Sequence, residues 1–139
     1  MNKQKKLLFL STFGSYPEFD NVFRENQFQV TKAQTLRKAL SLIKQIRPDI
    51  IVAEFIYAPT YGSQLSNFES LFAAAQTFSP HANFIALVHR DDLEHMTKVS
   101  LNVSPNNNNY QVLTLPTNAA ELAMCLDSIT VNGQENTKR

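Results

Sequence analysis

The residues best suited to chemistry follow two short apolar runs. After the first run comes the segment Ser11–Ser15, which supplies hydroxyl groups and a glycine just ahead of a candidate helix. Such a loop at a helix N-terminus can bind an anion through its backbone N–H groups. After the second run, Ile50–Ala53, comes Glu54, which supplies a carboxylate. The sequence therefore offers donors for an anion in one place and an acid group in another.

A second group of polar side chains has the composition of a metal site. His89, Asp91, Asp92 and His95 lie close together, and Asp91 and His95 are spaced as i and i+4. A helix would place that pair on one face, and zinc accepts both ligand types. Asp91 and Asp92 also fit the first turn of a helix, where negative charge is favourable. We favour this second interpretation, so neither a metal nor a cofactor is predicted.

Cys125 is the only cysteine, so the chain can form neither an internal disulfide nor a zinc site of several thiolates. Its apolar neighbours Leu122, Met124 and Leu126 indicate a buried thiol in a reducing compartment rather than a nucleophile.

The chain also has only three glycines and no Gly-x-Ser-x-Gly segment. These counts exclude a phosphate-binding loop, a dinucleotide-binding motif and an α/β-hydrolase nucleophile. We therefore predict that the protein is not an enzyme.

The composition is that of one compact domain. The 139 residues are 43% hydrophobic and 18% charged, and the net charge is +1. Because the chain is not strongly basic and its cations look scattered, apart from the lysines at the start, we expect no direct nucleic-acid partner. No apolar stretch approaches ~20 residues, and the run after Lys6 is too short for a signal peptide. We expect a cytoplasmic protein with no membrane contact.

Short apolar segments alternate with segments of helical periodicity along the chain. The strand candidates are Lys6–Leu10, Phe28–Val30, Ile50–Ala53, Phe84–Val88 and Tyr110–Leu115. The helix candidates are Pro17–Asn26, Thr35–Arg47, Leu65–Phe78, Asp91–Val99 and Asn118–Ile129. Two helices begin with residues spaced as capping boxes, Ser15 with Glu18 and Asn118 with Glu121.

This alternation predicts an α/β domain with a parallel sheet. Five strands and five helices indicate a flavodoxin-like, doubly wound sheet of three layers with strand order 2-1-3-4-5. We assign residues 1–130 to this domain and the polar residues 131–139 to a flexible tail. In such sheets, ligands bind beyond the carboxyl ends of the strands. That edge should gather the segments Ser11–Ser15, Glu54–Gly62, Val88–Asp92 and Leu115–Asn118.

Three segments form a further pattern, namely Pro48–Glu54 with Pro59 and Gly62 after it, Phe84–Val88, and Val112–Pro116. Taken together, they resemble the motifs of bacterial response-regulator receiver (CheY-like) domains. The segment Pro48–Glu54, followed by Pro59 and Gly62, is similar to the receiver pattern of Pro-Asp, an apolar strand, a phospho-accepting Asp, a Pro and a Gly. Phe84–Val88 resembles the fourth receiver strand, and Val112–Pro116 resembles the fifth strand with its Lys-Pro pair. The likeness covers nearly the whole chain. It implies the receiver fold and a role in two-component signal transduction.

The positions that carry phosphorylation chemistry in receivers are changed here, which indicates a degenerate or pseudo-receiver. The resemblance places the acidic pair that holds Mg²⁺ at Ser11 and Thr12, or at Thr12 and Phe13. Hydroxyl groups are poor ligands for this hard cation. It places the phospho-acceptor at Glu54, which is one methylene longer than Asp. Two interpretations of Glu54 remain open, a permanent mimic of the phosphoryl charge and a solvated carboxylate at a strand end.

The remaining receiver positions also lack their usual groups. The resemblance places the Thr or Ser that contacts the phosphoryl group at Val88 or His89, and the neutralising Lys at Leu115. It places the switch aromatic at Val112 and a family cis peptide at Leu115–Pro116. Because catalysis of phosphoryl transfer depends on positioning and charge neutralisation, we expect no autophosphorylation.

The alternative is a flavodoxin-type electron carrier that binds FMN. Ser11–Ser15 resembles the loop that cradles the FMN phosphate, and Pro59–Gly62 resembles the loop beside the flavin ring. The single glycine of the first loop and the short connection between the fourth and fifth strands count against this alternative. A yellow purified protein would support it.

We prefer a phosphorylation-independent, receiver-like module that binds a protein partner or a second copy of itself. The resemblance implies a contact face formed by the fourth helix, the fifth strand and the last helix. The candidate contact residues on this face are Lys98, Tyr110, Val112 and Glu121. Reversing the charge of Lys98 or Glu121 should weaken the complex. A domain that only scaffolds, with no ligand, is a third possibility.

Overall fold

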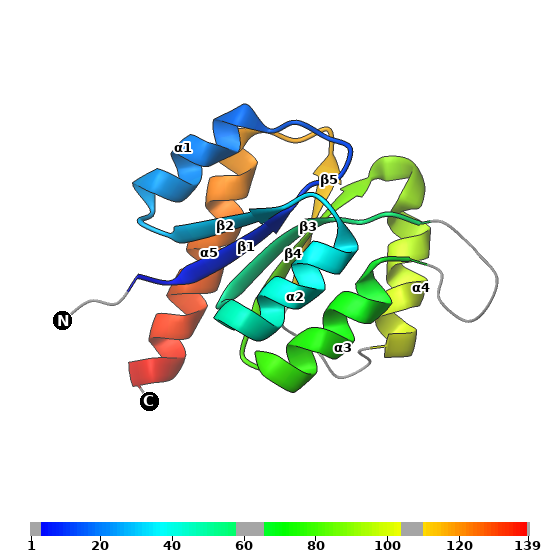
Figure 1. The fold of residues 1–139 in the computed structure, drawn as a ribbon. Helices are drawn as coiled ribbons and strands as arrows, with labels where there is room; N and C mark the ends of the chain where they lie inside the picture. Colours follow the sequence, from blue (N-terminus) through cyan, green and yellow to red (C-terminus); the bar gives the residue numbers. More distant parts are fainter. Residues whose placement is uncertain (1–3, 58–65, 104–109, 139) are drawn as a thin grey trace.

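The computed structural model describes residues 4–57, 66–103 and 110–138. The strands are β1 Lys6–Leu10, β2 Gln29–Ala33, β3 Ile50–Glu54, β4 Asn83–His89 and β5 Tyr110–Leu115. The helices are α1 Pro17–Glu25, α2 Leu36–Ile46, α3 Phe68–Phe78, α4 Leu93–Val103 and α5 Ala119–Lys138, with a short 3₁₀ turn, η1, at Arg90–Asp92. All strand pairs are parallel and the order is β2-β1-β3-β4-β5, which confirms the predicted doubly wound fold (Figure 1).

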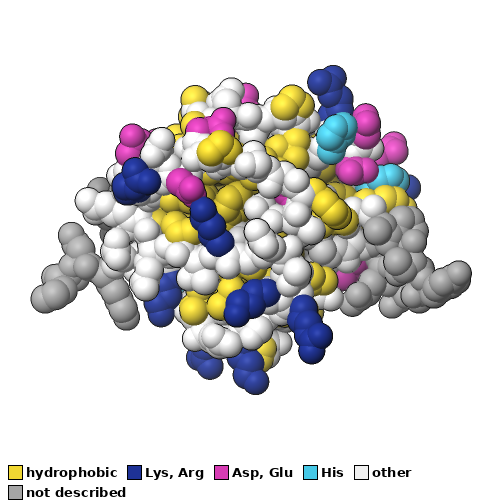
Figure 2. Space-filling view, turned by 45° about the horizontal axis from the view of Figure 1, so that its top comes forward, with side chains coloured by type: hydrophobic (Ala, Val, Ile, Leu, Met, Phe, Trp, Pro, Cys, Tyr) yellow, Lys and Arg dark blue, Asp and Glu magenta, His cyan; other side chains and the backbone are white. Residues whose placement is uncertain are grey.

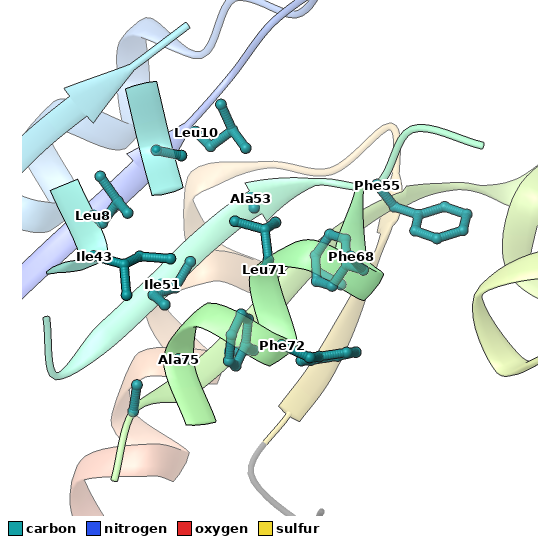
Figure 3. Close-up of a cluster of buried hydrophobic side chains, with 14 of the residues drawn as sticks. Leu8, Leu10, Ile43, Ile51, Ala53, Phe55, Phe68, Leu71, Phe72 and Ala75 are labelled. Carbon is teal, nitrogen blue, oxygen red and sulfur yellow. The ribbon is translucent and has the colours of Figure 1, made fainter. Parts of the chain in front are cut away.

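The sheet is covered on both faces, which explains the continuous apolar strands. One core cluster joins the sheet to α2, α3 and α4. Within it, the ring of Phe68 lies against those of Phe55, Phe72 and Phe84 (Figure 3). A second cluster joins the opposite face to α1 and α5. Every residue of β3 is buried, including its terminal Glu54. An ionisable side chain therefore lies at the end of the most enclosed strand.

The predicted helix starts are only partly confirmed. The Ser15–Glu18 capping box is wrong, because Tyr16 is the N-cap and makes no side-chain cap bond. Pro at the first helical position pre-sets the backbone there instead. At α5, the Asn118 side chain accepts from the Glu121 N–H at 2.9 Å, as predicted. The Glu121 carboxylate accepts from the Thr117 hydroxyl at 2.8 Å.

Several elements differ from their predicted boundaries, and α3 begins at Phe68 rather than at Leu65. β2 is longer than predicted and reaches Ala33, and α4 follows the η1 turn and continues to Val103. The segment 131–138, predicted to be a flexible tail, continues α5 as helix, because extending a helix adds one backbone hydrogen bond per residue after nucleation. Pro59, Gly62 and Leu65 lie outside the described residues. Within the described part of the chain, no helix has the length and apolarity needed to cross a membrane.

Candidate functional site

Glu54 ends β3 at the carboxyl edge of the sheet, beside the loop that leaves β1. The pairing of Leu10 with Ala53 brings that loop, residues 11–16, next to the Glu54 side chain. Glu54 is only 5% exposed. The interpretation of Glu54 as a solvated carboxylate is therefore wrong, because the side chain turns into the loop and finds its hydrogen-bond donors there.

Four hydrogen bonds from the loop hold the Glu54 carboxylate. The N–H groups of Thr12 and Phe13 donate to Oε1 at 2.5 and 2.9 Å. The Gly14 N–H and the Tyr16 hydroxyl donate to Oε2 at 2.6 and 2.7 Å. Three consecutive N–H groups around one anion form the kind of nest that commonly binds phosphate. In this chain the nest holds a carboxylate of the protein itself.

The close approach of the loop requires a glycine at position 14. A Cβ atom added to Gly14 would overlap the Tyr16 side chain and would lie 2.5 Å from Oε2 of Glu54. Tyr16 has little freedom to move away, because its ring stacks on Phe19 with centroids 5.0 Å apart and also contacts Phe9. The donor hydroxyl is thus positioned by aromatic residues of the core.

The backbone of Glu54 is fixed from the other side by Asn67. The Asn67 side-chain amide donates to the Glu54 carbonyl at 2.7 Å, and its oxygen accepts from the Ile56 N–H at 2.9 Å. Asn67 is itself buried, and its hydrogen bond to the Glu54 carbonyl is shielded from water, whereas the one from the Ile56 N–H is part-buried. The end of β3 therefore has a defined direction, which aims the carboxylate at the β1–α1 loop.

Replacing Tyr16 by Phe tests the hydroxyl contact. Loss of one hydrogen bond to a charged acceptor should lower the free energy of unfolding by about 1.5–3 kcal/mol near neutral pH. Burial, and next the hydrogen bond and charge of Glu54, raise the pKa of Tyr16 well above its ordinary value of 10.0. Neutral Tyr16 is favoured in the fold, so its contribution is complete below pH 10 and is lost as the pH rises further.

Urea unfolding of both proteins at pH 8 and above pH 10 checks this prediction. The stability difference between the wild type and Tyr16→Phe should shrink as the pH rises. A difference that stays constant across this range would contradict the proposed role of the hydroxyl.

The other predicted site positions contribute no donor to Glu54. Val88 is fully buried in β4, whereas His89 is exposed and its Nδ1 accepts from the Asp91 N–H at 3.2 Å. Leu115 is half-buried and precedes a cis peptide bond, Leu115–Pro116. Among the described residues, every hydrogen bond to the Glu54 carboxylate comes from the β1–α1 loop.

The donor set around Glu54 does not fit the Mg²⁺ ion that the receiver resemblance implies. Mg²⁺ needs oxygen lone pairs, whereas the loop presents N–H and O–H hydrogens to the carboxylate. Ser11 and Thr12 stand where the acidic pair would be, and no three His, Cys, Asp or Glu side chains converge within the described residues. A flavin phosphate would need the same N–H groups that Glu54 occupies. The segment Pro59–Gly62 of the FMN alternative lies outside the described residues.

The histidines and aspartates after β4 do not form a common site. His89 lies 3.5 Å from Asp91. His95 instead stacks face to face on Tyr57, with ring centroids 3.6 Å apart. The stack brings α4 into contact with the segment that follows β3. The sequence did not predict a contact between these two parts of the chain.

Cys125 is half-buried on α5 and packs against the core cluster that covers α1 and α5. Burial, and then the charge of Glu121, raise the pKa of its thiol. A thiol with a raised pKa is a poor nucleophile at neutral pH. The prediction of a fully buried thiol is therefore wrong, because α5 leaves Cys125 at the border of the core and Met124 exposed. The raised pKa is consistent with the expectation that Cys125 is not a nucleophile.

The predicted contact residues occupy different environments. Lys98, Val112 and Glu121 are exposed, on α4, β5 and α5 respectively. Tyr110 is half-buried, and its ring packs edge-on against Phe72 with centroids 6.2 Å apart. Part of Tyr110 therefore belongs to the core rather than to a free surface.

Sequence reasoning found Glu54 and the loop but missed the roles of Gly14 and Tyr16. The three N–H donors are backbone groups, so residue types cannot reveal them. The single glycine within Ser11–Ser15 was a usable signal, since glycine often marks a close approach to the backbone. Nothing in the sequence marked the Tyr16 hydroxyl as a partner of a residue 38 positions away.

No family model and no curated protein matches this chain. Among solved structures, it is similar to the signal receiver domain of a LuxO repressor protein from Vibrio parahaemolyticus, with TM-score 0.71, 13% identity, and coverage of 97% of this chain and 96% of that one. It is equally similar to a CheY-like receiver domain protein from Methanospirillum hungatei, with TM-score 0.71, 16% identity, and coverage of 97% and 99%. A structure described as an adenylate cyclase from Rhodopirellula baltica follows, with TM-score 0.65, 17% identity and 97% coverage of both chains. The chain therefore has the fold of response-regulator receiver (CheY-like) domains.

Proposed function

We propose that this chain is a signalling module of the receiver type that acts without phosphorylation, through contact with another protein. The observation that carries the proposal is the Glu54 carboxylate, held by the loop N–H groups of Thr12, Phe13 and Gly14. The acceptor side chain is committed to these donors and is not free to attack a phosphoryl donor. No catalytic role is proposed for it.

Local charge supports the same conclusion. Phosphoryl transfer to a carboxylate needs cations that offset the charge of the incoming group. The position of the neutralising Lys holds Leu115, which has no charge, and the Mg²⁺ positions hold Ser11 and Thr12, or Thr12 and Phe13, in place of carboxylates. The position of the Thr or Ser that contacts the phosphoryl group holds Val88 or His89. The Glu54 charge is already stabilised by four charge-assisted hydrogen bonds. The site therefore has a stable anionic form without any modification.

Amide NMR spectra recorded during addition of Mg²⁺ and then beryllofluoride, a phosphoryl mimic, test the first part of the proposal. We expect no shifts at Thr12–Gly14, Glu54 or Val88–His89. Shifts clustered at these amides would show a working phosphorylation site and would overturn the proposal.

The variant Glu54→Ala is the matched control for that experiment. It removes the internal carboxylate and frees three N–H donors. Added inorganic phosphate should then shift the amides of Thr12–Gly14 in the variant but not in the wild type. A variant that does not respond would show that the loop is not an anion nest, which would remove the basis of the proposal.

The contact face of α4, β5 and α5 is supported by exposed apolar side chains. β5 is an edge strand, with α4 packed in one core cluster and α5 in the other. Leu93 and Val112 are each 37% exposed, and Met124 is 70% exposed. Three of the four exposed large hydrophobic residues in the described chain thus belong to these elements. Exposed apolar side chains on all three elements of the proposed face support its use as a protein-binding surface.

Light scattering over a concentration series tests whether a second copy occupies this face. The variant Met124→Glu removes an exposed apolar group without opening the core, and Gln76→Glu adds the same charge on α3, outside the face. We expect Met124→Glu to weaken self-association or partner binding at least fivefold while Gln76→Glu has no effect. Equal behaviour of the two variants would contradict the assignment of this face.

A further inference from the structure

The charges of the chain are segregated along the sequence. The segment 26–48, which contains β2 and α2, holds Lys32, Arg37, Lys38, Lys44 and Arg47 and no acidic residue. It therefore carries +5, and because the whole chain carries +1, the remainder carries −4. Cations that look scattered in the sequence are thus concentrated on two adjacent elements of the fold.

The exposed side of α2 consists only of hydrogen-bond donors. Its exposed residues are Arg37, Lys38, Ser41, Lys44 and Gln45. With 3.6 residues per turn, these five side chains project within an arc of about 120°. No acidic and no large apolar residue interrupts them. In the lower part of Figure 2, the charged side chains that are visible are dark blue.

The same surface continues past both ends of α2. At the start, a pocket of about 420 Å³ is lined by Lys32 of β2, Lys38 of α2 and the residues between the two elements, including the N-cap Thr35. At the end, Arg47 is the C-cap of the helix. Of the five cations of this surface, only Lys32 lies within ion-pair distance of a described carboxylate, Asp20 at 2.9 Å. Lys44 lies over the Phe78 ring, with its Nζ 5.8 Å from the ring centroid. Arg37, Lys38 and Arg47 have no carboxylate partner among the described residues.

We propose that the exposed surface of α2, with Lys32 and Arg47, binds the phosphate backbone of double-stranded nucleic acid. Basic side chains along one helix face are the electrostatic signature of such binding, and Ser and Gln also donate to phosphates. A protein partner is less suitable, because protein interfaces use apolar and aromatic anchors, and none of the exposed large hydrophobics lies on α2. The overall charge of +1 hides this surface, because the described acidic residues form no ion pair with it apart from Asp20 beside Lys32.

Fluorescence polarisation of the full chain with a labelled 20-base-pair DNA duplex tests the proposal. We expect binding with a Kd on the order of 10 µM at 50 mM salt, and a log–log salt slope of about −3 to −4 for about four phosphate contacts. The variant Arg37→Gln/Lys44→Gln should weaken binding about tenfold and reduce the slope by about 2. The variant Arg24→Gln/Arg90→Gln makes the same change in net charge on other elements and should bind normally.

The variant Arg47→Gly distinguishes an effect on nucleic-acid binding from an effect on protein stability. Arg47 adopts a left-handed conformation, with φ of 50°, in which glycine is favoured over other residues. Arg47→Gly should therefore raise the melting temperature and still reduce the salt slope by about 1. A variant that is both more stable and weaker in binding cannot owe the weaker binding to unfolding.

Three results would overturn the proposal. The first is no binding below 100 µM at 50 mM salt. The second is an equal loss of affinity in the two double variants, which would show an effect of net charge alone. The third is competition by poly-glutamate, or by vesicles containing anionic lipid, at the same charge concentration as the duplex. That result would indicate an acidic protein or a membrane as the partner.

Discussion

Replacing Glu54 by alanine should lower the free energy of unfolding by about 2–4 kcal/mol. Each hydrogen bond to a charged acceptor contributes about 1.5–3 kcal/mol, but the freed N–H groups of the exposed loop can bind water, so the four contributions do not add fully. Glu54→Gln should lower the free energy of unfolding by more than half of the loss expected for Glu54→Ala. The reason is that the NH₂ group of the glutamine would face the N–H donors of the loop. Urea denaturation of each variant, analysed by linear extrapolation, measures the losses.

Phe13→Ala is the control for these two variants. The Phe13 side chain is 81% exposed, and the residue contributes only its N–H to Glu54, which alanine retains. Its stability should therefore stay within about 0.5 kcal/mol of the wild type. A Glu54→Ala protein as stable as Phe13→Ala would show that the carboxylate does not hold the loop.

Replacing Gly14 by alanine should destabilise the protein by about 1–3 kcal/mol, the usual cost of forcing extra volume into a filled site. The added methyl group would lie 2.5 Å from Oε2 of Glu54, so the carboxylate or the loop must move. Gly14 has no left-handed backbone angle, and the expected loss is therefore due to space rather than to conformational strain. Thermal and urea unfolding both report it.

A double-mutant cycle separates this explanation from a general effect on the loop. When Glu54 is already alanine, the methyl group at position 14 has one obstacle fewer, so Gly14→Ala should cost about half as much. Independent, additive losses in the double variant would contradict direct competition between the methyl group and the carboxylate.

The sheet topology could be predicted because it depends on patterns that residue types display. Continuous apolar runs such as Ile50–Ala53 identify central parallel strands, and the alternation with amphipathic helices determines the strand order. The helix start at Thr35 was visible for the same reason, since a hydroxyl side chain ahead of an apolar stripe favours an N-cap, and it accepts from the Lys38 N–H at 3.1 Å.

The site could be located but not described from the sequence. The rule for parallel sheets placed Glu54 and the loop Ser11–Ser15 at one edge, and that much is confirmed. The direction of the carboxylate was not predictable, because its partners are mostly backbone groups, which every residue possesses. The basic surface was missed for a related reason, since a helix gathers on one side residues such as Arg37 and Lys44 that are separated in the sequence.

The anion that fills the β1–α1 loop is a side chain of the protein itself. It therefore behaves differently from an anion that binds from solution or from a phosphoryl group that is added by modification. The Glu54 carboxylate cannot be diluted, competed away at low concentration or removed by hydrolysis, because a covalent tether keeps its effective concentration high. The fraction of molecules with a filled loop therefore equals the folded fraction, which exceeds 99.9% for a domain stable by about 5 kcal/mol or more. The number of such molecules in a cell is then determined by synthesis and degradation.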